Sequence, residues 1–139
     1  MKNKKFALHL HLVWATWDRE PWILPEIEGR VYRNISKQVH EKGCKILAIN
    51  DMPNHIHLVV KLSTTTTIVD LVKKAKGVSS RFINEIIKSE DHFRWQIGYG
   101  AFTISRWDLD KIIYYVRNQK SHHNNSKLVL HLEEVFDRS

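Results

Sequence analysis

The fold is decided by residues 45–62, "KILAINDMPNHIHLVVKL", which contain two apolar, β-prone runs. Between the runs lies Asp51-Met52-Pro53-Asn54, a segment rich in residues that favour turns. Two such runs joined by a short turn predict an antiparallel pair of strands.

The second run carries His55 and His57, which are two residues apart. Side chains at this spacing on a strand point to the same face, while the apolar residues that alternate with them take the other face. The pair could therefore chelate a metal ion, or it could be a polar strand face with satisfied hydrogen bonds. His9 and His11 repeat the spacing near the N-terminus, so spacing alone does not choose between the pairs. The turn just before His55, where a metal and a substrate could approach, favours the second pair.

Three amphipathic segments and two further strands surround the hairpin. Residues 7–17 and 98–105 are β-prone, whereas 26–42, 67–86 and 108–120 place apolar residues at helical spacing. Thr67 with Asp70 resembles a capping box at the start of the second helix. The order β-α-β-β-α-β-α predicts an α+β protein with a ferredoxin-like core: a four-stranded antiparallel sheet, two helices across one face, and an additional C-terminal helix.

The length of 139 residues and the hydrophobic fraction of 42% predict one domain over residues 1–139. Its core is expected over about 6–106, followed by the helix at about 108–120 and a short tail. The net charge of +7 favours a polyanionic partner such as nucleic acid. Cys44 is the single cysteine, which excludes an internal disulfide and fits a cytoplasmic protein. No apolar run approaches the ~20 residues of a membrane-spanning helix.

The last predicted helix carries Tyr115 and Gln119, which are four residues apart and so lie on one side of it. Lys111 lies four residues earlier on that side, while Tyr114 projects nearly opposite. A phenol at this place can be an ordinary amphipathic surface residue. The functional alternative is a nucleophile that attacks a phosphodiester, with the Gln119 carbonyl oxygen joining His55 and His57 around one divalent metal.

Four separated blocks then point to a known family: "MPNHIHLVV", "KGVSSRFIN", "WQIGYGAFTIS" and "YYVRNQKSHH". Their order and spacing resemble the single-tyrosine HUH transposases of bacterial and archaeal insertion sequences. The resemblance spans about residues 6–123. This family includes domesticated members that are associated with repetitive extragenic palindromes (REP).

This resemblance implies cleavage and rejoining of single-stranded DNA at insertion-sequence ends through a 5′-phosphotyrosine, with Mg²⁺ or Mn²⁺ as cofactor. It assigns Tyr115 as the nucleophile and His55, His57 and Gln119 as metal ligands, and it leaves His9 and His11 outside the metal motif. It also implies recognition of DNA hairpins and a homodimer in which the tyrosine helix can act on the partner's site.

Basic residues are the expected contacts to DNA phosphates. The candidates are Lys73, Lys74, Lys76 and Arg81 on the second helix, together with Lys111. A solvated helix face is an equally good interpretation for any one of them. Two other functions stay open: a non-catalytic module that binds single-stranded nucleic acid on the same fold, and another HUH nuclease such as a replication initiator or relaxase. The short chain argues against the last of these.

Overall fold

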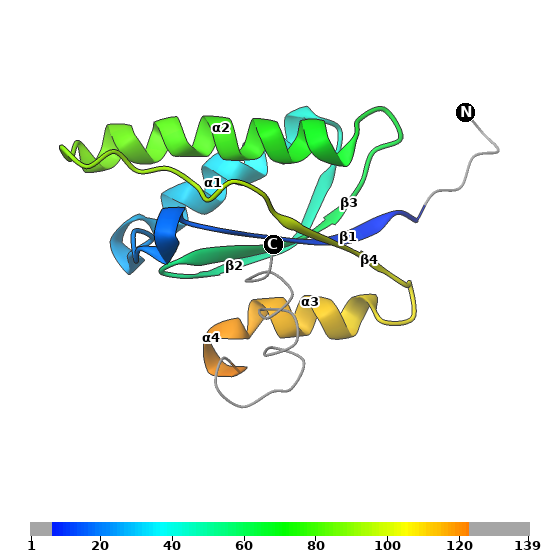
Figure 1. Cartoon of the computed structure of the whole chain (residues 1–139). Helices are drawn as coiled ribbons and strands as arrows, with labels where there is room; N and C mark the ends of the chain where they lie inside the picture. Colours follow the sequence, from blue (N-terminus) through cyan, green and yellow to red (C-terminus); the bar gives the residue numbers. More distant parts are fainter. Residues whose placement is uncertain (1–6, 123–139) are drawn as a thin grey trace.

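The computed structural model describes residues 7–122, and in this range the chain forms four strands and four α-helices (Figure 1). The elements in chain order are β1 (His9–Ala15), the short 3-10 helix η1 (Trp17–Arg19), α1 (Pro25–Glu41), β2 (Lys45–Met52), β3 (His55–Lys61), α2 (Ile68–Ile87), β4 (Gly100–Ile104), α3 (Leu109–Arg117) and α4 (Gln119–His122). The predicted tail lies outside the described residues.

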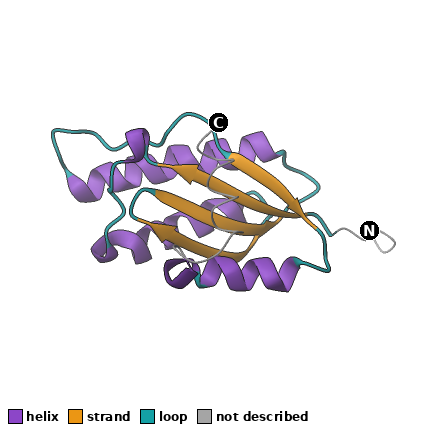
Figure 2. Ribbon diagram, turned by 60° about the horizontal axis from the view of Figure 1, so that its bottom comes forward, coloured by secondary structure: helices purple, strands orange, loops and turns teal. Residues whose placement is uncertain are grey.

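The strands form one antiparallel sheet in the order β2-β3-β1-β4. Helices α1 and α2 cover one face of this sheet, and α3 and α4 lie against the other (Figures 1 and 2). The predicted α+β, ferredoxin-like arrangement with a four-stranded antiparallel sheet is therefore confirmed. The predicted hairpin over residues 45–62 is the pair β2–β3.

The two long helices begin where the sequence provides a helix start. Pro25 occupies the first turn of α1, where its missing N–H removes no helical hydrogen bond. At α2, the hydroxyl of Thr67 accepts from the backbone N–H of Asp70 at 3.1 Å, which satisfies one of the otherwise free donors of the first turn. The predicted cap of α2 is thus confirmed.

The two faces of β3 enter different cores. Ile56, Leu58 and Val60 are buried in the large core beneath α1 and α2. Val59, on the opposite face, belongs to a smaller core that also contains Tyr115 and other residues of α3. Both faces of this central strand are therefore buried, so any polar side chain on it needs a partner inside the protein.

The helix predicted over residues 108–120 is interrupted. Helix α3 ends at Arg117, Asn118 adopts φ −109° and ψ 20°, and α4 begins at Gln119. The side-chain amide of Asn50 donates to the carbonyl oxygens of Val116 and Arg117, each at 3.0 Å. These tertiary bonds satisfy carbonyl groups at the end of α3, which stabilises the end of the helix at this point. Among the described residues, no helix has the length and apolar character required to span a bilayer.

Candidate active site

The two histidines of β3 are buried beneath α3 and α4, with exposed fractions of 1% for His55 and 0% for His57. His55 Nδ1 lies 2.7 Å from the carbonyl oxygen Oδ1 of Asn54, so Nδ1 must donate. In the neutral ring this leaves a lone pair on Nε2. The turn before β3 therefore fixes the tautomer of His55 that can bind a metal.

Tyr115 and Gln119 lie beside these histidines within one chain. The ring centroid of Tyr115 is 6.2 Å from that of His57, and Gln119 Nε2 is 2.9 Å from His55 Nε2. Tyr115 is 5% exposed, whereas Tyr114 is 62% exposed, as expected for side chains on opposite sides of α3. The structure thus brings together the four residues that the sequence selected.

The chemistry of these donors fits a divalent metal. Gln119 is fully buried, and its Oε1 accepts no hydrogen bond within the described part of the chain. Rotation of the amide would exchange its Nε2 for Oε1 opposite the Nε2 atom of His55, giving an oxygen ligand beside an imidazole nitrogen. Within residues 7–122, no group of three or more His, Cys, Asp or Glu side chains is arranged to hold a metal ion. A metal site here would consist of two imidazoles and an amide, which would leave coordination positions open for phosphate oxygens.

A third histidine, which the sequence did not select, completes the cluster. His11 is 2% exposed, and its Nε2 lies 2.8 Å from Nδ1 of His57. Burial lowers the pKa of His11 from 6.5 to about 4 because the charged imidazolium loses its hydration. The available signal was the repeated His-x-His spacing, but only the pairing of β1 with β3 brings His11 to His57.

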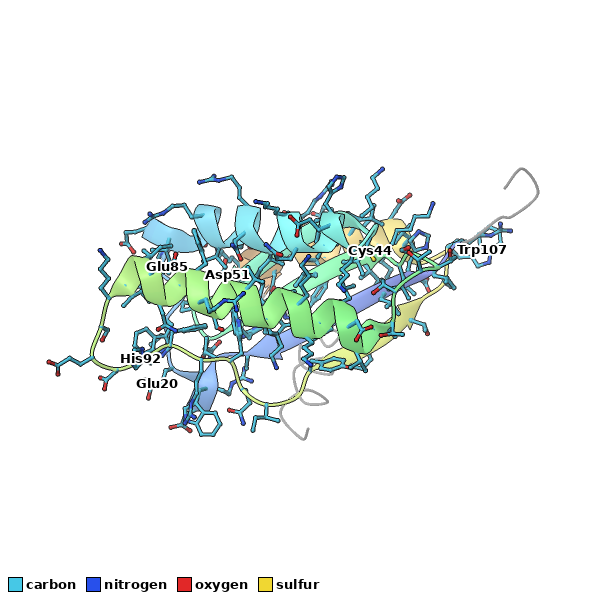
Figure 3. The ribbon with its side chains drawn as sticks, turned by 90° about the horizontal axis from the view of Figure 1, so that it is seen from above. Glu20, Cys44, Asp51, Glu85, His92 and Trp107 are labelled. Atoms are coloured by element: carbon cyan, nitrogen blue, oxygen red, sulfur yellow. The ribbon has the colours of Figure 1, made fainter. Side chains whose placement is uncertain are left out.

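The junction between α3 and α4 is anchored to α1 and β2 by polar contacts. Lys120 lies 2.7 Å from Glu28 and 3.5 Å from Asp51, and the hydroxyl of Tyr32 donates to Asp51. Burial raises the pKa of Asp51 to about 7, although the nearby Lys120 opposes this shift. In Figure 3, Trp107 lies at one end of the molecule and Asp51 lies well away from it, nearer the middle. Lys120 directly follows Gln119 in α4, so its contact with Asp51 anchors the segment that carries Gln119. No local pattern in the sequence indicated this cluster, because its members come from three separate segments.

The predicted DNA contacts on α2 separate into two groups. Lys73, Lys74 and Arg81 line a shallow hollow of about 320 Å³, where Lys74 also pairs with Glu41 at 2.7 Å. Lys76 instead donates to the backbone carbonyls of Gln96 and Gly98 at 2.7 and 3.0 Å. Burial lowers its pKa. These contacts favour a structural role for Lys76, which fastens the segment that leads to β4.

Lys111 is exposed on α3 and lines a different hollow, of about 250 Å³, between β4 and α3. His11 and Phe102 also border this hollow, so it adjoins the histidine cluster. Lys111 is consequently on the same side of the sheet as Tyr115, whereas the hollow on α2 is on the opposite side.

The chain is similar to known proteins in sequence and in fold. The family model described as "Transposase IS200 like" matches residues 4–119. The ISDra2 transposase TnpA of Deinococcus radiodurans is 26% identical over 119 residues, which cover 82% of this chain and 85% of that protein.

Two solved structures share the fold. A crystal structure from Deinococcus radiodurans R1, assigned as a transposase, has a TM-score of 0.69 and 25% identity, covering 84% of this chain and 94% of that one. A REP-associated tyrosine transposase bound to a REP hairpin has a TM-score of 0.65 and 14% identity, covering 91% of this chain and 76% of that one. Because the family model extends over most of the sequence, and across both the sheet and the helix that carries Tyr115, this chain belongs to the IS200-like transposase family.

Proposed function

We propose that this transposase cleaves and rejoins single-stranded DNA with Tyr115 as its nucleophile. The supporting observation is the assembly of Tyr115, Gln119 and the two β3 histidines around one buried point, although β3 and α3 are far apart in sequence. Membership of a transposase family supports DNA cleavage and rejoining in general. The four side chains offer a specific mechanism for this cleavage and rejoining: a tyrosine nucleophile beside a metal site.

In this proposal, the Tyr115 oxygen attacks the scissile phosphorus as the bond from phosphorus to the 3′ oxygen breaks. The phenol loses its proton, the departing 3′ oxygen gains one, and the 5′ phosphate stays on Tyr115 as an ester. Attack on this ester by a 3′ hydroxyl reverses the step and rejoins a strand. Storage of the phosphodiester on the protein explains how joining can proceed without ATP.

His55, His57 and Gln119 are the proposed ligands of Mg²⁺ or Mn²⁺. A bound divalent ion would act as a Lewis acid on the phosphate oxygens and would orient the scissile group. Asn54 maintains the ligand tautomer of His55, and the anchored α3–α4 junction keeps Gln119 close to it. Lys111, exposed beside the cluster, would attract the DNA phosphates toward Tyr115.

Lys73, Lys74 and Arg81 are proposed to bind the backbone of a DNA hairpin. They lie on the α2 side of the sheet, so recognition and chemistry would use different faces. The expected homodimer, with exchange of tyrosine helices between subunits, stays a prediction. The described chain brings Tyr115 to its own histidines without exchange.

Formation of a covalent adduct tests the proposal. The protein is incubated with Mn²⁺ and labelled single-stranded DNA tiled across the flanks of its coding region, and adducts are resolved under denaturing conditions. We expect an adduct with the native protein and with Tyr114→Phe, and none with Tyr115→Phe. An adduct that survives Tyr115→Phe would show that another residue is the nucleophile. A non-catalytic binding module would retain the DNA but form no adduct with any variant.

A second candidate function is that of a domesticated relative acting on repetitive extragenic palindromes. The structural neighbour that binds a REP hairpin motivates this alternative. Tiled substrates distinguish the two: an insertion sequence has its cleavable hairpins beside its own coding region, whereas a domesticated enzyme cleaves scattered palindromes elsewhere in the genome.

A further inference from the structure

We infer that His11 is a positioning residue that accepts a hydrogen bond from Nδ1 of His57 and so directs the Nε2 lone pair of His57 toward the metal. This inference rests on the proposed metal site and adds to it a residue outside the HUH motif. It follows from the contact between the two rings and from the fact that a neutral imidazole carries a proton on only one of its two nitrogens.

The register of the sheet creates the contact. His11 is paired with Val59, and Val13 is paired with His57, so His11 and His57 are diagonal neighbours on the same face. Their ring centroids are 5.0 Å apart with an interplanar angle of 26°, and Nε2 of His11 is 2.8 Å from Nδ1 of His57. Both side chains are almost completely buried, so water does not compete for this hydrogen bond.

Only one assignment of the shared proton is compatible with a metal on His57. If His11 donates, Nδ1 of His57 is the acceptor, and the proton of the neutral ring resides on Nε2, where it blocks coordination. If His57 donates from Nδ1, its Nε2 keeps a lone pair for the metal. His11 must then be the acceptor through Nε2. Metal binding at Nε2 of His57 therefore requires that Nδ1–H of His57 donates to Nε2 of His11.

His11 acts through His57 and is not itself a ligand, because the nitrogen that it directs at the cluster is already used in this bond. Hydrogen-bond partners of metal-binding histidines fix the ring and its tautomer, and their loss typically weakens metal binding by about 10- to 100-fold. His55 has the corresponding partner in Asn54. Each proposed histidine ligand thus has an acceptor at its Nδ1, one from the turn before β3 and the other from the neighbouring strand.

Metal affinity tests this role without any cleavage assay. Free Mn²⁺ is measured by electron paramagnetic resonance during titration of the full-length protein. We expect His11→Met, which fills similar space without a comparable acceptor, to weaken binding about 10- to 100-fold. His11→Gln offers a side-chain oxygen acceptor and should recover most of the affinity. His9→Gln, on the same strand but outside the cluster, is the matched control and should bind as the native protein does.

The outcomes separate this inference from the function on which it rests. If His57→Ala weakens Mn²⁺ binding and His11→Met does not, the role of His11 is refuted, while the proposed metal site stands. Equal losses in the Met and Gln variants, with both proteins folded by circular dichroism, would show that the ring packs without acting as an acceptor. Native protein that binds no Mn²⁺, or binding indifferent to His57→Ala, would overturn the proposed site and this inference together.

A measurement on the native protein covers the case in which the variants do not fold. Long-range ¹H–¹⁵N correlation spectra report which nitrogen of each histidine carries the proton. With Mg²⁺ present, we expect His57 to be protonated at Nδ1. A His57 ring protonated at Nε2 while Mg²⁺ is bound would refute the inference, because His11 would then be the donor.

Discussion

The two faces of β3 have the same backbone and nearly the same burial but opposite chemistry. Toward α1 and α2 the strand presents Ile56, Leu58 and Val60, which pack in the main core. Toward α3 and α4 it presents His55 and His57, which depend on hydrogen bonds to groups from other segments. On the first face, burial of apolar side chains stabilises the fold. On the second face, burial of polar side chains costs free energy unless each finds a specific hydrogen-bond partner. The difference predicts that stability and activity can be separated between adjacent residues.

The largest expected effect is on catalysis by the polar face. His57→Leu removes a proposed ligand, so we expect adduct formation to fall about 1000-fold or more, since loss of metal stabilisation is worth several kcal/mol. Added apolar burial and the lost bond to His11 oppose each other, so the free energy of unfolding should change by no more than about 1 kcal/mol. Adduct assays and urea denaturation measure the two quantities.

Leu58→Ala is the matched control on the other face. It creates a cavity in the main core and should reduce the free energy of unfolding by about 2–5 kcal/mol. The protein that remains folded should form the adduct at the native rate, because the Leu58 side chain lies in the main core, on the opposite face of β3 from the site. If both variants lost stability and activity in the same proportion, the functional separation of the two faces would be wrong.

The next effect concerns the polar anchor of the α3–α4 junction and depends on pH. Burial raises the pKa of Asp51 from 3.8 to about 7, so the folded state prefers the protonated acid. This contribution to stability is fully present below pH 3.8 and is lost as the pH rises toward 7. Asp51→Asn should remove the loss. The variant should therefore gain about 2–4 kcal/mol relative to the native protein between pH 4 and pH 7.

His11 also changes stability with pH in this window, so the effect of Asp51 has to be measured as the difference between Asp51→Asn and the native protein. Burial lowers the pKa of His11 from 6.5 to about 4, so the folded state prefers the neutral ring. The contribution of His11 to stability is therefore fully present above pH 6.5 and is lost as the pH falls toward 4. The two residues have opposite slopes in the same window, and the native curve is flattened by their cancellation. Urea denaturation across this window, without added metal, should show a steeper rise with pH for Asp51→Asn. Parallel curves for the two proteins would show that Asp51 is not the group responsible.

The local pattern was sufficient for the fold and for most of the candidate site. Helical periodicity, the capping pair at Thr67 and the turn before His55 predicted the elements, because each signal lies within a few residues of its effect. His55, His57, Tyr115 and Gln119 were selected from spacing and the family resemblance. Their convergence in one cluster agrees with that selection, while their catalytic and ligand roles stay predictions.

The remainder depended on contacts that are distant in sequence. His11 and His57 are 46 residues apart, and only the register between β1 and β3 makes them neighbours. The break after Arg117 depends on Asn50, which reaches the end of α3 from β2. Lys76 looked like its basic neighbours on α2, but its side chain reaches the carbonyls of Gln96 and Gly98. Local periodicity carries no information about such partners.

The smallest expected effect is on DNA binding by the α2 face. Lys73→Gln with Arg81→Gln should weaken binding of a DNA hairpin about tenfold at low salt. Each lost phosphate contact should also reduce the slope of log affinity against log salt by about one. Because this hollow and Tyr115 lie on opposite sides of the sheet, the cleavage rate of bound DNA should be unchanged, so KM rises while kcat does not.

Lys61→Gln with Lys88→Gln is the control, since both residues are exposed and the net charge changes equally. Fluorescence anisotropy at several salt concentrations distinguishes a localised site from long-range attraction. Equal losses in the two double variants would mean that overall positive charge, and not this hollow, binds the hairpin. A reduced kcat in the first variant would mean that DNA on the α2 face affects the chemistry across the sheet, and the separation of recognition from catalysis would have to be abandoned.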